Sequence, residues 1–145
     1  MEKNQYNKRA INDVYKNAHI ALQSIKDLLP NIDDVELKNE LREQYEGYDK
    51  FIGKLSGYMA EHNFKPQDIN FMKKAMLWTS IKMKTAFNNS KNQVAEMMIK
   101  GSVMGINELT AMNNESVNLD PEISSFVKEL LALEETFNQR LKKYL

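Results

Sequence analysis

The chain contains no cysteine among its 145 residues, and only five glycines, three prolines and two histidines. The lack of cysteine excludes disulfide bridges, thiol catalysis and thiolate metal sites, and it is typical of proteins in a reducing compartment. Basic and acidic side chains number twenty each, so no positive excess indicates a nucleic-acid partner. We therefore expect a protein that does not bind nucleic acid.

Long apolar segments are missing as well. No hydrophobic run approaches the roughly 18 residues that a membrane-spanning helix needs, and the first ten residues, MEKNQYNKRA, lack the apolar centre of a secretory signal. We expect a cytoplasmic protein with no integral membrane association. The alternating pattern of a half-buried strand is also absent, and no Asn-Gly or Asp-Gly hairpin turn occurs. The predicted fold class is all-α.

Helical periodicity is what the sequence has in abundance. Apolar residues recur at steps of three and four over most of the chain, the spacing that places them on one face of a helix. The predicted stripes are Ile11, Val14, Ala18, Leu22, Ile25 and Leu29 in the first helix, Leu37, Leu41, Tyr48, Ile52, Leu55 and Met59 in the second, and Ile123, Val127, Leu130, Phe137, Leu141 and Tyr144 in the last. Proline separates the periodic segments, and Asp33 or Asp34, Ser90 and Asp120 are suited to cap the helices that follow. We predict five helices, over residues 5–29, 34–62, 68–88, 90–112 and 121–145.

Two pairs of segments are similar to each other and indicate an internal repeat. Residues 14–25 (VYKNAHIALQSI) align without a gap with 98–109 (MIKGSVMGINEL), and 40–55 (ELREQYEGYDKFIGKL) with 129–144 (ELLALEETFNQRLKKY). The repeat predicts one domain, 1–145, in which the hairpins 5–62 and 90–145 are joined by a crossover helix, 68–88. It also aligns Gly105 with Ala21, where a small residue lets a neighbouring side chain approach the helix closely.

The segments KAMLWTSIKM (74–83) and VAEMMIKGSVMGINEL (94–109) resemble the ferritin-like superfamily, particularly its small bacterial members. This resemblance implies a four-helix bundle with one long crossover. In active members, a Glu of each first helix and a Glu-x-x-His of each second helix hold two metal ions. The chain has no Glu-x-x-His, and the corresponding positions read Tyr45-x-x-Tyr48 and Glu134-x-x-Phe137. We therefore expect no metal and no cofactor, and Glu134 is the one candidate metal ligand.

Glu134 lies on the apolar face of its predicted helix, together with Leu130 and Leu141. A buried carboxylate is unfavourable unless it is paired or hydrogen-bonded. The expected explanation is a hydrogen bond to Tyr45 or Tyr48, or an exposed position near the helix end. The alternative is a carboxylate that binds a ligand. Other acidic residues are expected to face solvent: Glu36, Glu40, Glu43, Glu46, Glu96 and Glu108.

The predicted helix 68–88 has apolar side chains on two faces. Phe71, Leu77, Trp78 and Ile81 lie opposite its core stripe and are interleaved with lysines. Three interpretations fit this pattern: a helix wedged between other helices, half of a homodimer interface with aromatic anchors, or a basic amphipathic helix on an acidic lipid surface. We predict a homodimer through these four residues, and the sequence names no other protein partner.

No enzyme motif is present, because a glycine-rich phosphate loop, a nucleophile elbow and His-Glu-x-x-His are all missing. We therefore expect a metal-free structural or protein-interaction module that associates with itself, with no catalytic residue. Two alternatives stay open. One is a redox enzyme with an atypical dinuclear metal site built on Glu134, and the other is a carrier of a small apolar ligand held among the methionines.

Overall fold

The computed structural model of the chain describes residues 2–66 and 90–145. These residues form four α-helices and three single turns of 3-10 helix: α1 (Lys3–Leu28), η1 (Leu29–Asn31), α2 (Val35–Glu61), α4 (Lys91–Asn114), η2 (Ser116–Asn118), α5 (Pro121–Leu141) and η3 (Lys142–Tyr144). No strand occurs in either described stretch, which confirms the all-α class. The predicted helix 68–88 lies outside the described residues, and so do the predicted interface residues Phe71, Leu77, Trp78 and Ile81.

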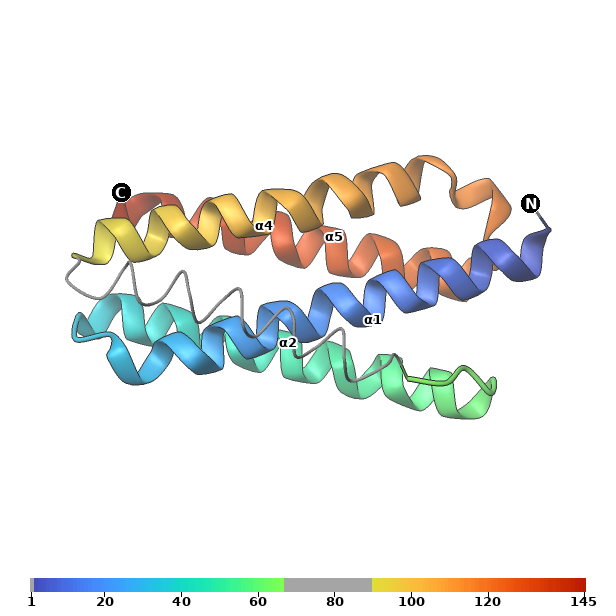
Figure 1. The fold of residues 1–145 in the computed structure, drawn as a ribbon, viewed down its shortest axis with the longest axis horizontal. Coiled ribbons are helices and arrows are strands. Elements are labelled where there is room, and N and C mark those ends of the chain that lie inside the picture. The colour runs from blue at the N-terminus through green and yellow to red at the C-terminus, as the bar shows by residue number, and fades with distance from the viewer. Residues whose placement is uncertain (1, 67–89) are drawn as a thin grey trace.

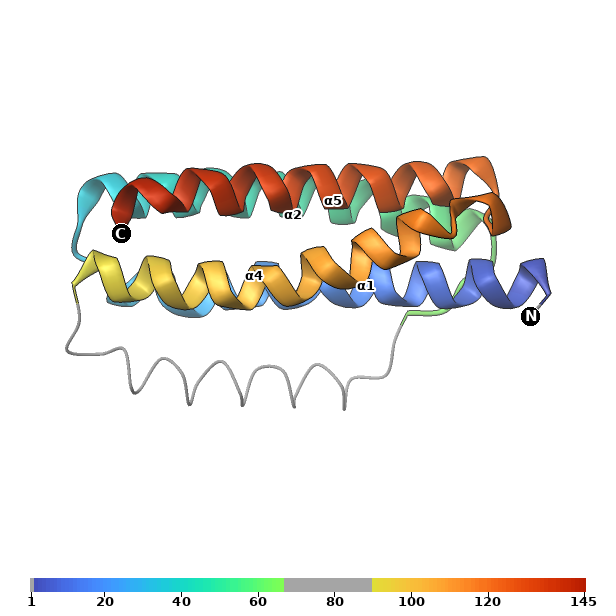
Figure 2. The same cartoon turned by 90° about the horizontal axis from the view of Figure 1, so that it is seen from above.

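The four helices pack as a bundle of two antiparallel hairpins, α1 with α2 and α4 with α5 (Figure 1). Turned by 90°, the bundle shows two layers, one formed by α1 and α4 and the other by α2 and α5 (Figure 2). Helices α2 and α4 run in the same direction, so the first described stretch ends (green) toward one end of the bundle and the second begins (yellow) at the other. Within residues 2–66 and 90–145, no helix combines the length and apolarity needed to cross a bilayer.

Each helix turns an apolar stripe toward the centre of the bundle. In α1, Ile11, Val14, Ala18 and Ile25 are buried as the periodicity predicts, and Leu22 is partly buried against them. Burial of one such aliphatic side chain contributes about 1.5–3 kcal/mol. The stripes predicted for the second helix of each hairpin are buried in full: Leu37, Leu41, Tyr48, Ile52, Leu55 and Met59 in α2, and Ile123, Val127, Leu130, Phe137, Leu141 and Tyr144 in α5 and η3.

The helices α2, α4 and α5 begin directly after the predicted capping residues, but only one of these residues makes a capping hydrogen bond. Asp34 accepts a hydrogen bond from the backbone N–H of Leu37 at 2.8 Å and so caps α2. Ser90 and Asp120 directly precede α4 and α5, but neither side chain makes a capping bond. The Asp120 carboxylate instead accepts from the Asn7 amide at 3.0 Å, and the Asp120 N–H donates to Asn7 Oδ1 at 3.0 Å. Asp120 therefore does not cap α5. It bonds Asn7 instead and so connects the start of α5 to α1.

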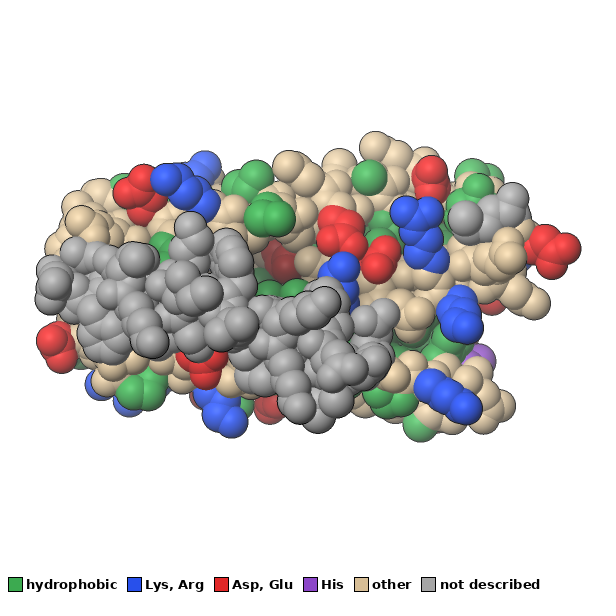
Figure 3. Space-filling model, viewed as in Figure 1, with side chains coloured by type: hydrophobic (Ala, Val, Ile, Leu, Met, Phe, Trp, Pro, Cys, Tyr) green, Lys and Arg blue, Asp and Glu red, His purple; other side chains and the backbone are tan. Residues whose placement is uncertain are grey.

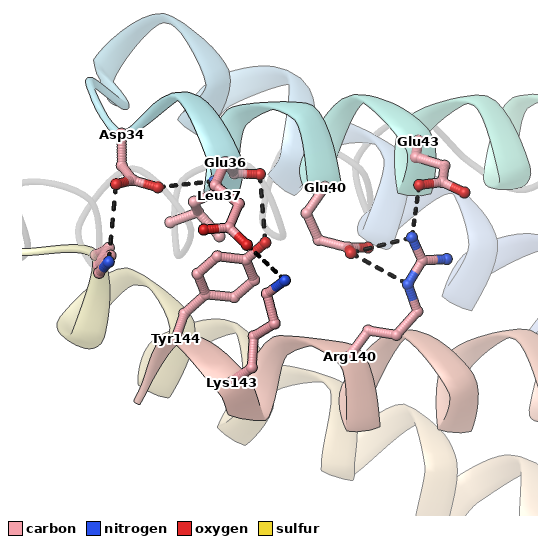
Figure 4. A network of polar contacts seen from close by, with 9 residues as sticks. Asp34, Glu36, Leu37, Glu40, Glu43, Arg140, Lys143 and Tyr144 are labelled. Atoms are coloured by element: carbon pink, nitrogen blue, oxygen red, sulfur yellow. Dashed lines mark hydrogen bonds and ion pairs between the residues drawn. The ribbon is translucent and has the colours of Figure 1, made fainter.

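Ion pairs join α2 to the end of α5 and to η3 (Figure 4). Arg140 Nη2 lies 3.0 Å from Glu40 Oε1 and 2.6 Å from Glu43 Oε2, and Lys143 Nζ lies 2.5 Å from Glu36 Oε1. The prediction that these acids face solvent is confirmed for Glu36 and Glu43, whose side chains are exposed, and is wrong for Glu40, whose side chain is 10% exposed. The register of α5 brings its cations alongside these carboxylates. Exposed pairs contribute at most about 1 kcal/mol each, so the network mainly orients α5 on α2.

Gly47 of α2 lies against the Phe137 ring of α5, and a Cβ atom at residue 47 would lie 2.8 Å from Phe137 Cζ. The ring is buried and packs edge-on against Tyr48, with 5.4 Å between the ring centres.

We expect Gly47→Ala to lower the free energy of unfolding by about 1–3 kcal/mol because the added methyl overpacks this contact. Urea unfolding measures the effect. Gly53→Ala is the control: no described atom lies within 4 Å of its Cβ position, and it should stabilise the helix by up to about 1 kcal/mol. A Gly47→Ala protein as stable as the parent would contradict this packing.

Candidate functional site

A cavity of about 490 Å³ lies between α1 and α4, and its floor is formed by α2 and α5. The space-filling view shows a hollow in this face, with hydrophobic and acidic side chains inside it (Figure 3). Most of the lining is apolar. The described lining residues are Lys16, Asn17, Ile20, Ala21, Ser24, Ile25 and Leu28 of α1; Gln44 and Tyr48 of α2; Met97, Met98, Gly101, Ser102, Met104, Gly105 and Glu108 of α4; and Glu134, Phe137, Asn138 and Leu141 of α5.

Glu134 is the buried acid of this cavity and is only 3% exposed. The helical repeat places it between Leu130 and Phe137 on the stripe that α5 turns inward. Its Oε2 atom has no hydrogen-bond partner among the described residues. The expected hydrogen bond from Tyr45 or Tyr48 is therefore wrong, and so is the expected exposure. The Tyr48 ring packs against Phe137 instead.

The pKa of Glu134 is raised from 4.5 to about 8, chiefly because burial disfavours the charged form and further because the Glu108 carboxylate lies nearby. The carboxyl group is therefore mostly protonated at neutral pH. Glu108 was expected to face solvent, but it lines the cavity, and its Oε1 atom lies 3.9 Å from Lys16 Nζ. The cavity thus contains two acidic side chains, of which only Glu108 has a paired cation among the described residues.

Gly105 provides the space that these groups occupy. A Cβ atom at residue 105 would lie 2.8 Å from Asn17 Oδ1 and 3.1 Å from each carboxyl oxygen of Glu134. The prediction that a neighbouring side chain approaches this position closely is confirmed. Gly101, one turn earlier, has no described atom within 4 Å of its Cβ position, so the close approach does not extend to it.

Three amide side chains that the sequence analysis did not single out also line the cavity. Asn138 donates to the carbonyl oxygen of Ile99 at 3.2 Å and to Ser102 Oγ at 2.6 Å. The amide of Asn17 donates to the carbonyl oxygen of Asp13 at 2.9 Å, and that of Gln44 to Glu40 Oε2 at 3.1 Å. The sequence gives little indication that these amides line a cavity. A polar residue at the edge of an apolar stripe has the same pattern as a polar residue that faces solvent.

The residues do not fit the dinuclear metal site that the ferritin-like resemblance implies. No group of three His, Cys, Asp or Glu side chains that could hold a metal ion occurs in the described part of the chain. The Tyr48 and Phe137 rings, at the two positions where that resemblance implies histidines, pack on each other. Neither histidine is among the described lining residues. The ring of His19 packs against that of Tyr15, with 4.2 Å between the ring centres, and the ring of His62 stacks on that of Tyr58, with 4.1 Å between the centres.

Comparison of the chain with protein-family models, with curated proteins and with solved structures finds no match. We therefore infer function from the chemistry of the cavity.

The raised pKa of Glu134 makes the stability of the protein depend on pH. The carboxyl group is protonated in both states below pH 4.5, but between about pH 4.5 and 8 the unfolded chain ionises while the folded protein keeps the proton. Stability from this group is therefore lost as pH rises, by up to about 1.4 kcal/mol per pH unit. We expect Glu134→Gln to gain stability relative to the parent from pH 5 to 8, measured by urea unfolding. Glu135→Gln, at an exposed neighbour, is the control, and a constant difference between parent and Glu134→Gln would contradict the raised pKa.

Proposed function

We propose that the protein is a ferritin-like helical bundle without a metal centre, and that it binds a small, mainly apolar molecule in the cavity between α1 and α4. The observation that carries this proposal is a buried carboxyl group in a cavity of about 490 Å³, with an oxygen, Glu134 Oε2, that has no hydrogen-bond partner among the described residues. A buried polar group without a partner is unfavourable. A bound molecule that reaches Glu134 would supply the missing partner.

The size and lining of the cavity support binding of a small molecule. Ligand sites are commonly cavities of about 300–1,000 Å³, mostly apolar, with a few polar groups that fix the orientation of the ligand. Here the apolar contribution includes Met97, Met98 and Met104. Methionine side chains are flexible and polarisable, and they adapt to ligands of different shape.

The direction of the helices supports the ferritin-like assignment. Two antiparallel hairpins, with α2 and α4 running the same way, require one long connection between them, as in ferritin-like bundles. The aromatic pair in the interior supports the metal-free form of this proposal. The predicted homodimer remains a prediction, because its four interface residues lie outside the described part of the chain.

Methionine signals provide a test of ligand binding with an internal control. We expect 1-octanol to shift the ¹³C-methyl NMR signals of Met97, Met98 and Met104, which line the cavity, and to leave that of Met59, which is buried elsewhere in the core. The apolar chain would contribute about 0.8 kcal/mol per buried CH₂ group. The proposal fails if the three cavity signals do not move, or if Met59 moves along with them.

A filled cavity should no longer bind the alcohol. Gly101 and Gly53 both lie in helices, and neither has a described atom within 4 Å of its Cβ position, but only Gly101 lines the cavity. We expect Gly101→Leu to weaken 1-octanol binding at least tenfold and Gly53→Leu to leave it unchanged, as measured by calorimetry. Equal affinity in the two variants would place the alcohol elsewhere.

A further inference from the structure

The amide groups of the cavity donate hydrogen bonds to described residues but accept none from them. The amide nitrogens of Asn17, Gln44 and Asn138 all donate to protein oxygens. None of their side-chain oxygens accepts a hydrogen bond from a described residue in return. The Oε2 atom of Glu134 is likewise without a described partner. A ligand that carries hydrogen-bond donors would therefore satisfy these oxygens.

Three of these oxygens converge on one point at the surface of α4. Asn17 Oδ1 approaches it from α1, and both carboxyl oxygens of Glu134 approach it from α5, each within 3.1 Å of the position that a Cβ of residue 105 would take. Because residue 105 is glycine, these oxygens pack directly against the backbone of α4. A donor group that lies in the cavity next to them would contact oxygens from two helices at once.

The charges of the cavity select against an anionic ligand. The described lining includes the carboxyl groups of Glu108 and Glu134 and one cation, Lys16, whose Nζ lies 3.9 Å from Glu108 Oε1. A carboxylate or phosphate ligand would place a further negative charge beside these acids. A cation would reduce the repulsion between the acids.

We propose that the cavity takes a primary alkylamine, with its ammonium group beside Gly105 and its chain along the apolar wall that includes Ile20, Met97 and Met98. An ammonium group has three N–H donors and no acceptor, which complements the oxygens of Asn17 and Glu134. Charge-assisted hydrogen bonds of this kind are shorter and stronger than those between neutral groups. This inference names the ligand class for the proposed function and rests on it.

The pH dependence of binding should report on the same carboxyl group. The titratable groups that share the cavity with Glu134 are Glu108 on α4, Tyr48 on α2 and Lys16 on α1. Burial and Glu108 raise the pKa of Glu134 to about 8 in the free protein, whereas an adjacent ammonium group would lower it, so amine binding releases a proton near neutral pH. Amine affinity should therefore rise by up to tenfold per unit between pH 6 and 8, and that of a neutral alcohol should not.

Calorimetry with octylamine, 1-octanol and octanoate at pH 8 separates the head groups while the chain stays the same. We expect octylamine to bind the parent at least tenfold more tightly than 1-octanol, and octanoate to bind more weakly than both. Glu134→Gln should reduce the octylamine affinity at least tenfold and the 1-octanol affinity by much less, and Glu135→Gln should change neither. Gly105→Ala should weaken octylamine binding at least tenfold because its Cβ would push the oxygens of Asn17 and Glu134 out of place, whereas Gly53→Ala, away from the cavity, should not.

The outcomes distinguish the two proposals. If 1-octanol binds the parent as tightly as octylamine, or if Glu134→Gln keeps the preference for the amine, the amine inference is wrong and the apolar binding site stands. If none of the three compounds shifts the signals of Met97, Met98 and Met104, the proposed function itself is wrong.

Discussion

Glu134 stands about one turn from Leu130 and one turn from Phe137, on the stripe that α5 buries in the bundle. A carboxyl group in that position has to be neutral, paired or in contact with a polar ligand. The residues that surround Glu134 leave room for its carboxyl group and place polar atoms next to it. Gly105 leaves room for the carboxyl oxygens on the side of α4, and Asn17 brings a further oxygen to the same place from α1. The buried acid, the glycine and the cavity are therefore one feature of the molecule, and a side chain at residue 105 would disturb all three.

The contact between α2 and α5 has closer ion pairs than the contact between α1 and α4. Between α2 and α5, Arg140 bridges two carboxylates and the Tyr48 and Phe137 rings pack edge-on. Between α1 and α4, the ion pair of Lys16 and Glu108 is longer, at 3.9 Å. Only three residues of α4 are buried, against eight of α5. The cavity thus lies beside the helix that, among the described helices, contributes the fewest buried residues to the core.

The sequence predicts well those features that depend on neighbours along the chain. The stripes of α2 and α5 are correct residue by residue because a period of 3.6 fixes which side chains share a face. The cap at Asp34 is correct because its partner lies three residues away. Asp120 could not be read in this way, since its carboxylate bonds Asn7, 113 positions distant in the chain. The same limit applies to the cavity. The sequence shows Glu134 as an acid on an apolar face. It does not show that Glu108 and Asn17 are neighbours of Glu134, because they come close to it only when α1 and α4 pack side by side.

The environment of Glu134 also favours an organic ligand over a metal ion. In the ferritin-like pattern a histidine follows the glutamate by three residues, so that both reach one ion from the same helix face. Phe137 occupies that position here and packs against Tyr48, which fills the space with carbon. A metal ion requires deprotonated ligands, whereas burial holds the pKa of Glu134 at about 8. A metal would have to displace that proton and still lack partners of the right kind. A molecule with an apolar body and a few N–H groups needs only the surfaces and oxygen atoms that the cavity already presents.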